Sequence, residues 1–588
     1  MSVLLAVALL HVGQPNTLEF HVSPKGSDTH AGTARAPFAS IERAKEAVRE
    51  AVARRLTTNV DVVIHEGTYE LSRPLLFTPA DGGTERFRVR YVAARGDRVT
   101  FSGGSRISGW RRGDGGVWTA HAPWAFSQLV VNGRRAVRAR TPDLGATPEY
   151  MELARADLAE DRSLYTLATQ PGQLADWEHP QDIEVVVLGN WEITRKRVQA
   201  IDPMTNTIVL APPHAGGHDA IRPGPGRFYF LENAREFLGE PGEWYLNEGT
   251  GEVSYLPRPG EDMATAGVIA PRLTRLIEVR GTEGHPVRNL HFQGIRFAHA
   301  DWVMPDFGFN GIQASFHCIP TEGARGWAWD TWECIEPAIR FEFADSCTLT
   351  DGALEFLRGV GIRVLKGCTH CRIIGNAVHS IGASGIMVGE NGNLADPVVP
   401  RGNRVENNVV HDCGLDDYGA VGIWVAFTNG TRVAHNLVYN LPYTGISVGF
   451  QWDESPTCCA NNRIEYNHVH HVLQRLCDGG CIYTLGLQPG TVLRGNWLHD
   501  ALRAGSAQGA PNNGIFFDQG SKGFTIVDNL IHATSAEPIR FNQCAADWHT
   551  FEANWFGDEA AGDPAADRIR DRAGLESPHR ERLSPPAP

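Results

Sequence analysis

Two aspartates lie at the ends of corresponding strand-like stretches in neighbouring copies of a repeated sequence pattern. Asp478 precedes the strand-like stretch that begins at Gly480, and Asp518 follows the corresponding stretch Gly514–Phe517 of the next copy. Two carboxylates about 5 to 10 Å apart in one groove can cleave a glycosidic bond, one as general acid and the other as base or nucleophile. Mutual repulsion and different surroundings would separate their pKa values. The pair is therefore a candidate for this chemistry.

The position of Asp518 within the repeat favours a chemical role. When Gly480 is aligned with Gly514, Asp518 falls into a column that is small in the other copies. The members of that column are Gly389, Ala426, Gly449 and Thr484. The backbone does not require an acid at such a position. The structural alternative is that Asp478 belongs to an Asp-Gly turn and that Asp518 caps a loop.

Other residues of the same region could bind a sugar. A stack of coils offers a long groove beside one face, and aromatic rings with a polar tip suit sugar rings. The candidate substrate-binding residues are Asp417, Trp424, Tyr443, Trp452, Tyr483 and Glu390. For any single aromatic residue, ordinary core packing is the alternative. Further acids that could line the groove are Asp416, Asp453 and Glu454.

The elements that must position these residues are indicated by a phrase that recurs from Arg372 to Phe556. Each copy is a short alternating strand, an Asn, a second apolar pair and a turn, and a third short strand such as Gly422–Val425 usually follows. The copies lie roughly 30 residues apart, which is typical of a stacked solenoid. Strands this short gain stability when coils stack and give each strand parallel neighbours about 4.8 Å away. The pattern predicts the all-β class and a right-handed parallel β-helix.

The Asn of each phrase has a structural interpretation. It recurs as Asn408, Asn436 and Asn467, among others. We expect it at a bend, in the left-handed conformation that Asn tolerates, with its side chain bonded to the backbone of the adjacent coil. This ladder would support the fold and take no part in catalysis.

The remaining sequence divides into segments of different character. A helix from Ile41 to about Arg55, with Ser40 as its N-cap, is expected to cover the open end of the solenoid. The Gly- and aromatic-rich stretch Trp302–Trp332 is predicted to be a functional loop. The predicted divisions are 1–19, a possible signal peptide or disordered start; 20–108, the capping helix and first coils; 109–265, an inserted antiparallel β domain; 266–558, the main β-helix; and 559–588, a C-terminal cap and a frayed tail.

Composition limits the classes of partner. The 588 residues are 42% hydrophobic and 21% charged, which indicates a folded chain, and the net charge is −14. An acidic protein is a poor partner for nucleic acid or an anionic membrane. We expect an oligo- or polysaccharide substrate and a monomer.

The N-terminus and the cysteines bear on the compartment. The apolar run Val3–Leu10 has the length of a secretory signal, which predicts a secreted or periplasmic protein. All 11 cysteines fall at or after Cys318, and their places in the repeat indicate small core residues. Export to an oxidising compartment would allow one or two disulfides. No metal site and no cofactor are predicted.

Four stretches together resemble glycoside hydrolase family 141. They are Val22–Asp28, the hairpin with Trp244-Tyr245-Leu246, Asp478–Gly486 and Gly514–Ser521. The resemblance extends over nearly the whole chain. It implies a parallel β-helix with an inserted β-sandwich, and α-L-fucosidase or xylanase activity on plant cell-wall glycans. It places the catalytic acids at Asp478 and Asp518. The chain departs from the family pattern at Gln519 and Cys481.

Two other functions are compatible with the same fold. A polysaccharide lyase acting on a uronate polymer would need a basic residue, and the candidates are Arg475, Lys522 and Arg540. A carbohydrate-binding solenoid without catalysis would need only the aromatic residues. Turnover on a glycan would distinguish a hydrolase from a binding solenoid without catalysis. An unsaturated product would identify a lyase.

Overall fold

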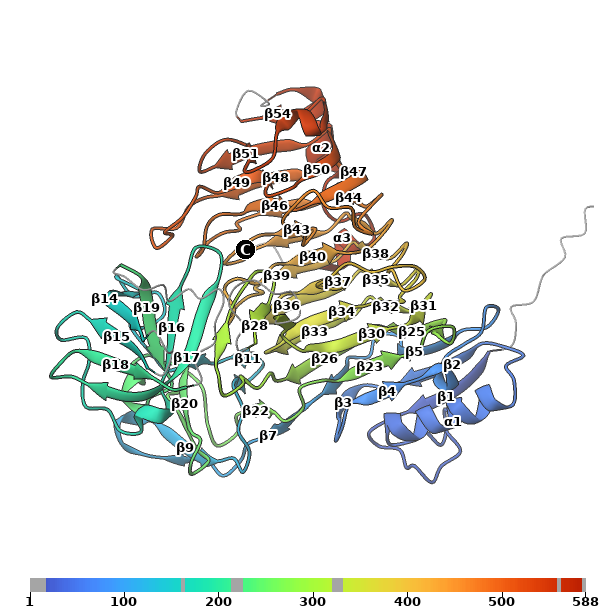
Figure 1. Ribbon diagram of the computed structural model, residues 1–588. Helices are drawn as coiled ribbons and strands as arrows, with labels where there is room; N and C mark the ends of the chain where they lie inside the picture. Colours follow the sequence, from blue (N-terminus) through green and yellow to red (C-terminus); the bar gives the residue numbers. More distant parts are fainter. Residues whose placement is uncertain (1–16, 160–163, 213–225, 320–331, 558–561, 584–588) are drawn as a thin grey trace, which may run out of the picture.

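The computed structural model describes residues 17–159, 164–212, 226–319, 332–557 and 562–583. The chain winds into a right-handed parallel β-helix, whose coils stack from the N-terminal helix at one end to the last short strands at the other (Figure 1). An insertion domain of mostly antiparallel strands lies beside the stack. The predicted signal segment Val3–Leu10 lies outside the described residues, and residues 18 and 19 already belong to the first strand.

Three parallel sheets form the walls of the solenoid. The 12-stranded sheet contains β1 (Leu18–Val22), β2 (Val60–Ile64), β5 (Val89–Ala93), β25 (Leu290–Gln293), β32 (Thr348–Thr350), β35 (Arg372–Ile374), β38 (Arg404–Glu406), β41 (Arg432–Ala434), β44 (Arg463–Glu465), β47 (Leu487–Arg494), β50 (Lys522–Val527) and β53 (Thr550–Glu552). The 11-stranded sheet contains β3 (Gly67–Glu70), β6 (Val99–Ser102), β26 (Ile295–Ala300), β33 (Ala353–Leu357), β36 (Ala377–Ile381), β39 (Val409–His411), β42 (Leu437–Tyr439), β45 (His468–His470), β48 (Trp497–Ala501), β51 (Leu530–Thr534) and β54 (Trp555–Phe556). The 10-stranded sheet contains β4 (Leu75–Phe77), β23 (Ile277–Arg280), β30 (Pro337–Glu342), β34 (Val360–Val364), β37 (Ile386–Gly389), β40 (Ile423–Ala426), β43 (Ile446–Val448), β46 (Gly480–Thr484), β49 (Asn513–Phe517) and β52 (Ile539–Phe541).

The N-terminal end is covered by helix α1 (Ile41–Ala53). The side-chain oxygen of Ser40 accepts a hydrogen bond from the backbone N–H of Arg43, so the predicted N-cap is present. The apolar face of α1, including Ile41 and Val48, is buried in the same core as the first coils. The helix therefore closes the first coil, as the sequence predicted, and ends two residues earlier than expected.

The Asn ladder runs along the corner between the 12-stranded and 11-stranded sheets. In each step, the side-chain amide and the backbone N–H of one Asn both donate to Oδ1 of the next, as from Asn436 to Asn467 at 2.9 and 3.1 Å. The amide also donates to a backbone carbonyl of the preceding coil, as from Asn467 to Val433. The ladder consists of Asn376, Asn408, Asn436, Asn467, Asn496, Asn529 and Asn554.

One feature of this ladder differs from the prediction. The left-handed conformation is adopted by the residue before each Asn, for example His435, Tyr466 and Asp528, and not by the ladder Asn itself. The preceding residue makes the bend, and the Asn is thereby directed along the stack. The expected hydrogen bonds to the adjacent coil are present.

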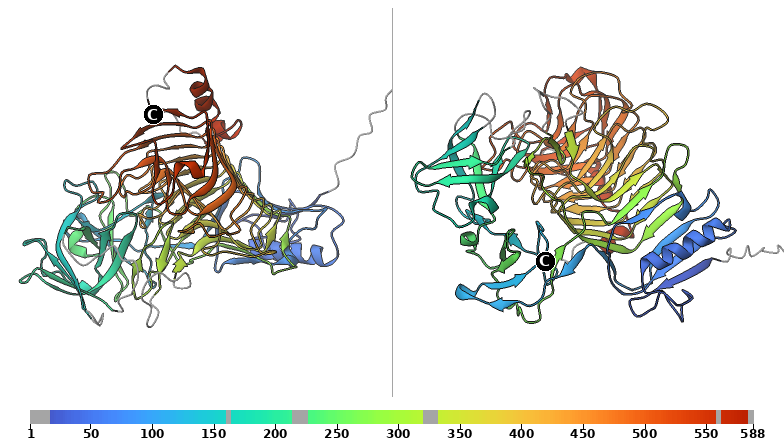
Figure 2. Two further views of the ribbon diagram at one scale, coloured as in Figure 1. Left: turned by 45° about the horizontal axis from the view of Figure 1, so that its top comes forward. Right: turned by 60° about the horizontal axis from the view of Figure 1, so that its bottom comes forward.

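The insertion domain is built from three small sheets, seen beside the solenoid in Figure 2. Their strands are β7 (Gly104–Arg106), β10 (Val130–Val131), β11 (Arg134–Arg135) and β22 (Val268–Pro271); β8 (Arg111–Arg112), β9 (Trp118–His121), β12 (Val137–Arg138), β20 (Glu243–Asn247) and β21 (Glu252–Tyr255); and β13 (Arg140–Thr141), β14 (Met151–Leu158), β15 (Tyr165–Thr169), β16 (Glu184–Leu188), β17 (Ile193–Asp202), β18 (Thr207–Leu210), β19 (Phe228–Glu232) and β27 (Phe309–Asn310). The predicted hairpin of β20 and β21 is present. Two separate apolar cores stabilise the domain.

The stretch predicted as a functional loop leaves the solenoid after β26, pairs with the insertion domain and leads back to β30 of the solenoid. It contains β27, which pairs with β17, and β28 (Phe316–Cys318), which pairs with β29 (Trp332–Cys334). Trp327 and Trp329, which the sequence singled out, lie outside the described residues. The described part lies over the outer face of the 10-stranded sheet, where Phe316 packs against Trp424.

The C-terminal segment turns back along the outside of the stack. After helix α2 (Pro564–Arg572), the backbone N–H of Gly574 donates to the carbonyl of Tyr466, and that of Glu576 donates to Oδ1 of Asn407. Helix α3 (His579–Leu583) continues to earlier coils, where Arg582 donates to the carbonyl of Gly375. The segment up to residue 583 is therefore docked, contrary to the predicted frayed tail. We call residues 573–583 the C-terminal strap.

All eleven cysteines are free thiols, and most of them are buried, as expected of small core residues. Within the described residues, no group of three or more His, Cys, Asp or Glu side chains has an arrangement that could hold a metal ion. None of the described helices is both long and apolar enough to span a membrane.

Candidate active site

The candidate site lies on the outer face of the 10-stranded sheet. The strand register aligns one outward residue from each coil into a column, which we call the site column. Its members from β37 to β52 are Met387, Trp424, Ser447, Tyr483, Phe516 and Arg540. The flanking residues Ile482 and Phe517 point into the solenoid core, whereas Tyr483 and Phe516 pack in a separate apolar cluster outside it. The column thus changes its chemistry at almost every coil.

The register corrects one step of the sequence alignment. Gly480 pairs with Asn513 and not with Gly514, so Thr484 lies beside Phe517 and faces inward. In the aligned coils, Asp518 therefore lies beside Leu485 and not beside Thr484. The loop between β48 and β49 offers several small or polar residues before the strand, and a shift by one residue exchanges the two faces of a strand. Asp518 still emerges on the outer face.

Asp518 is held by hydrogen bonds to both carboxylate oxygens. The hydroxyl of Tyr483 donates to Oδ2 at 2.6 Å, and the side-chain amide of Asn542 donates to Oδ1 at 2.7 Å. Gln313, from the strand-poor segment between β27 and β28, donates to the Tyr483 hydroxyl at 3.1 Å. Only 9% of Asp518 is exposed. This carboxylate is fixed in orientation and reached from one side.

Asp478 is more accessible and carries a different partner. Its side chain is 23% exposed, and its Oδ1 accepts a hydrogen bond from Nη1 of Arg540 at 3.1 Å. Asp478 adopts the left-handed conformation, with φ of 61°, at the turn before β46. The hydroxyl of Tyr443 donates to its backbone carbonyl at 3.0 Å, which fixes this turn.

One short strand serves both aspartates. Arg540 lies on β52 and Asn542 follows that strand directly, so the two side chains leave the same face of the backbone. Arg540 binds Asp478 and Asn542 binds Asp518. The last regular coil therefore brings the two acids, which are forty positions apart in sequence, to one place on the surface.

The two carboxyl groups also interact through their charges. Burial raises the pKa of Asp478, the Arg540 guanidinium opposes this rise, and the negative charge of Asp518 adds to it. This interaction agrees with the hydrogen bonds that hold both carboxyl groups beside the end of β52. The structure therefore brings together the two residues that sequence reasoning selected.

The predicted substrate-binding aromatics have different outcomes. Trp424, Tyr443 and Tyr483 are each at most 1% exposed, so they cannot present a face to a sugar ring, and this part of the prediction is wrong. They are covered because segments distant in sequence, such as the one with Phe316, pack over them. Tyr443 and Tyr483 instead orient the two aspartates. Trp452 is partly exposed and packs against the Tyr483 cluster.

The other predicted acids lie away from the pair or are enclosed. Glu390 follows β37, four coils from β49, which corresponds to about 19 Å along the stack. Its Oε2 lies 3.5 Å from Arg363, so it serves an ion pair. Asp417 is buried, which raises its pKa to about 6, and Oδ1 accepts from the backbone of Gly419 at 3.2 Å. These acids do not join Asp478 and Asp518.

The insertion domain borders the site. The carbonyl of Asn190, in the turn between β16 and β17, accepts a hydrogen bond from the backbone N–H of Cys477, next to Asp478, at 2.8 Å. Sequence reasoning missed this contact, and it missed Gln313 and Asn542, because each comes from a segment without the repeat. Arg540 was noted only as a possible lyase base. Its place in the site column was the signal that could have identified it.

The three candidate lyase bases are all engaged with carboxylates. Arg540 binds Asp478, Arg475 binds Glu149 at 2.5 Å, and Lys522 binds Glu454 at 2.6 Å. Each of the three side chains is therefore already paired with an acid.

Comparisons with known proteins agree with this architecture. Residues 337–534 match the family described as right-handed beta helix region, and residues 115–258 match the GH141 insertion domain. A solved structure described as a glycoside hydrolase is 25% identical, covers 96% of this chain and 100% of its own, and superposes with a TM-score of 0.84. The structure of XylC with xylose is 15% identical, with coverage of 89% and 70% and a TM-score of 0.48. A rhamnogalacturonan lyase is 10% identical, with coverage of 91% and 87% and a TM-score of 0.42. A search of curated proteins gives no match.

The stacked coils, the inserted domain and the likeness over almost the full length define a parallel β-helix glycosidase. The chain is a glycoside hydrolase family 141-like protein, and its substrates are glycans.

Proposed function

We propose that Asp478 and Asp518 form the acid/base pair with which this glycosidase hydrolyses its substrate. The observation that carries the proposal is the single strand end that binds both acids, Arg540 to Asp478 and Asn542 to Asp518. If Asp478 only formed a turn and Asp518 only capped a loop, the two side chains would not need to bind residues at the end of the same strand. Two carboxyl groups held beside one another on an outer face are what glycosidic-bond cleavage requires.

Asp478 is the general acid in this proposal. Its burial and the neighbouring Asp518 charge raise its pKa, which favours the protonated carboxyl group that must donate to the leaving oxygen. Asp518 is the base or nucleophile. Both of its oxygens accept hydrogen bonds, an arrangement that suits the ionised carboxylate, and each oxygen retains a further lone pair for a reacting group.

The reaction then follows from these roles. Asp478 transfers its proton to the glycosidic oxygen while the bond from that oxygen to the anomeric carbon breaks. Asp518 either removes a proton from the attacking water, which inverts the anomeric centre, or attacks that carbon and forms an ester that water later hydrolyses, which retains it. The configuration of the first-formed product, followed by NMR, distinguishes the two courses.

We infer the substrate class from the motifs around Asp478 and Asp518, which resemble a family active on plant cell-wall glycans. The expected activity is that of an α-L-fucosidase or a xylanase-like enzyme. Such polymers lie outside cells, and with the apolar run Val3–Leu10 this supports a secreted or periplasmic protein. We further propose that the enzyme acts as a monomer without a cofactor.

The test is kinetic and uses Asp478→Asn and Asp518→Asn on aryl α-L-fucosides and on xylan. Each variant should lose about 10²- to 10⁴-fold in kcat/KM on natural linkages, with an unchanged circular dichroism spectrum. Asp478→Asn should retain much more activity on aryl glycosides with good leaving groups, since these need little protonation. Asp453→Asn, an exposed acid of the same region, is the matched control. Full activity in both folded variants would overturn the assignment.

A further inference from the structure

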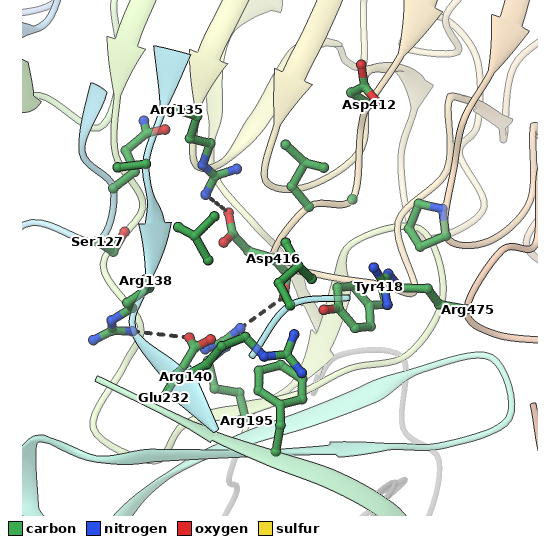
Figure 3. A pocket seen from close by; sticks show the side chains of 18 of the residues that line it. Ser127, Arg135, Arg138, Arg140, Arg195, Glu232, Asp412, Asp416, Tyr418 and Arg475 are labelled. Atoms are coloured by element: carbon green, nitrogen blue, oxygen red, sulfur yellow. Dashed lines mark hydrogen bonds and ion pairs between the residues drawn. The ribbon is translucent and has the colours of Figure 1, made fainter. Parts of the chain in front are cut away.

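A cavity separate from the acid pair lies between the insertion domain and the solenoid loops that precede β40, β43 and β46. Its volume is about 330 Å³, within the range of small-molecule sites. Neither Asp478 nor Asp518 lines it. Figure 3 shows the side chains around it, and five of them are arginines. These are Arg135, Arg138, Arg140, Arg195 and Arg475.

Four of the five arginines have a carboxylate partner. Arg135 pairs with Asp416 and Arg475 with Glu149, while Arg138 and Arg195 share the two carboxylates of Glu184 and Glu232. Of the acids that line the cavity, Asp416 and Glu232 are paired with these arginines, and Asp412 contacts His411. The adjacent guanidinium groups of Arg135 and Arg358 overcome the effect of burial and lower the pKa of Asp416 to about 2. The cavity holds no carboxyl group suited to donate a proton, so it is a binding site and not a second catalytic centre.

Arg140 is the exception. It is only 3% exposed, and it has no carboxylate within ion-pair distance among the described residues. Its Nε donates to the carbonyl of Pro142 at 2.9 Å, its Nη2 donates to the carbonyl of Glu149 at 3.1 Å, and its Nη1 has no partner in the described chain. The guanidinium lies 3.8 Å above the ring of Phe230. A buried charge without a counter-charge is unfavourable unless a ligand supplies one.

We propose that this cavity binds the carboxylate of a uronic acid residue, with Arg140 as its counter-charge. One uncompensated positive charge matches a single carboxylate, whereas a phosphate dianion would require two. The cavity is also much larger than a free anion, and Ser127, Asn440 and Gln474 line it with groups that can bind hydroxyls. An arginine fork suits a planar carboxylate.

The cavity adjoins the loop that leads to the acid pair, since Arg475 lines it and Asp478 follows three residues later. It would therefore recognise an acidic sugar of the same glycan that the proposed acid pair cleaves. In this respect the inference rests on the proposed function. The enzyme would favour acidic glycans over neutral ones of the same linkage.

The experiment compares D-galacturonate with D-galactose, which differ only in the carboxylate at C6. Both are titrated into the full-length protein by calorimetry or ligand-observed NMR. Neither contains a glycosidic bond, so binding is measured without turnover. Galacturonate should bind about 10- to 100-fold more tightly, the effect of one charge-assisted hydrogen-bonded pair. Arg140→Gln should abolish the difference, and Arg111→Gln, an exposed arginine of the same domain, should leave it unchanged.

A second pair of variants keeps the test decisive if Arg140→Gln does not fold. Leu144 lines the cavity and is 48% exposed, so charged substitutions there leave the core intact. Leu144→Glu should weaken galacturonate binding and Leu144→Arg should strengthen it, with galactose unaffected. Equal binding of the two sugars, or no binding of either, overturns the proposal. Sulfate that binds at least as tightly as galacturonate would identify an inorganic-anion site instead. Full activity in folded Asp518→Asn with preferential galacturonate binding intact would refute only the proposed function. Loss of activity in Asp518→Asn with equal binding of the two sugars would refute only this inference.

Discussion

Two columns of the same solenoid follow opposite rules. The Asn ladder repeats one side chain through seven coils, and each amide satisfies the next. The site column changes from Met387 to Trp424, Ser447 and Tyr483 in successive coils. Within the described residues, Nε1 of Trp424 and Oγ of Ser447 are buried without a hydrogen-bond partner. Repetition accompanies stability here, and departure from repetition accompanies chemistry.

The difference has a physical origin. Identical residues can stack because each presents to its neighbour the same donors and acceptors that it receives, so the ladder needs no outside partner. A site that binds and cleaves a ligand needs different groups at different heights, and it needs room for groups that the protein itself does not satisfy. Such positions are expected to be costly to stability and important to activity.

The largest expected effect is on the ladder. Asn467→Ala removes the acceptor of two donors of Asn436 and leaves the carbonyl of Val433 without its bond. Buried groups left unsatisfied cost about 1 to 3 kcal/mol each, so the free energy of unfolding should fall by roughly 4 kcal/mol. Urea denaturation measures this change. Asp518→Asn, measured in the same way, should change stability by about 1 kcal/mol or less while activity is lost. Equal losses of stability would remove the contrast between the columns.

The adjacent acids Asp416 and Asp417 should respond to pH with opposite signs. Burial raises the folded-state pKa of Asp417 to about 6, so its contribution is fully present below the unfolded pKa of 3.8 and is lost as pH rises through 6. Asp417→Asn should therefore stabilise the protein by about 3 kcal/mol at pH 8 and little at pH 3.5. The folded-state pKa of Asp416 is lowered to about 2, so its contribution is present above 3.8 and lost as pH falls through 2. Asp416→Asn should cost about 2 kcal/mol at neutral pH. Thermal denaturation across this pH range is the measurement, and the same sign for both variants would contradict the assignment.

Two asparagines of the last coil provide a matched pair. Asn542→Ala removes a donor to Asp518, and kcat/KM should fall about 10- to 100-fold with little change in stability. Asn554→Ala removes the last member of the ladder and should lower the melting temperature without changing kcat/KM. If Asn554→Ala impaired catalysis as strongly as Asn542→Ala, the division between the columns would not hold.

The smallest effect concerns the pH profile. Arg540 lowers the pKa of Asp478, so its removal in Arg540→Met should raise that pKa and keep the proposed acid protonated to higher pH. The alkaline limb of kcat/KM should move to higher pH. Arg568→Met, an exposed change on α2, serves as the control. A shift toward lower pH would be inconsistent with Asp478 as the acid.

Much of the fold followed from the sequence because the repeat encodes it. The third strand predicted at Gly422–Val425 is present as β40, shifted by one residue, and Ser40 caps its helix. The acid pair was found because Asp518 breaks a small-residue column. The register of β49 was missed by one residue, since the loop before it offers Asn513 as well as Gly514 as a partner for Gly480.

The surroundings of the acids were less accessible to prediction. The burial of Trp424 and Tyr483 depends on Phe316 and Gln313, which lie more than a hundred residues earlier and outside the repeat. Asn542 lies in the connection between β52 and β53, where no phrase marks it. Contacts of this kind form when segments distant in sequence pack together, and the local sequence repeat does not predict them.

The C-terminal strap has a consequence for how the molecule comes apart. A solenoid of similar coils ordinarily unfolds from its free end, one coil after another, because each coil contacts only its neighbours. Here the end of the chain is tied to the middle, through Gly574 to Tyr466 and Arg582 to Gly375. Unfolding from this end must first break those contacts, so the second half of the stack should unfold as one cooperative unit. Deletion of the C-terminal strap should replace that single transition with a series of smaller transitions at lower temperature.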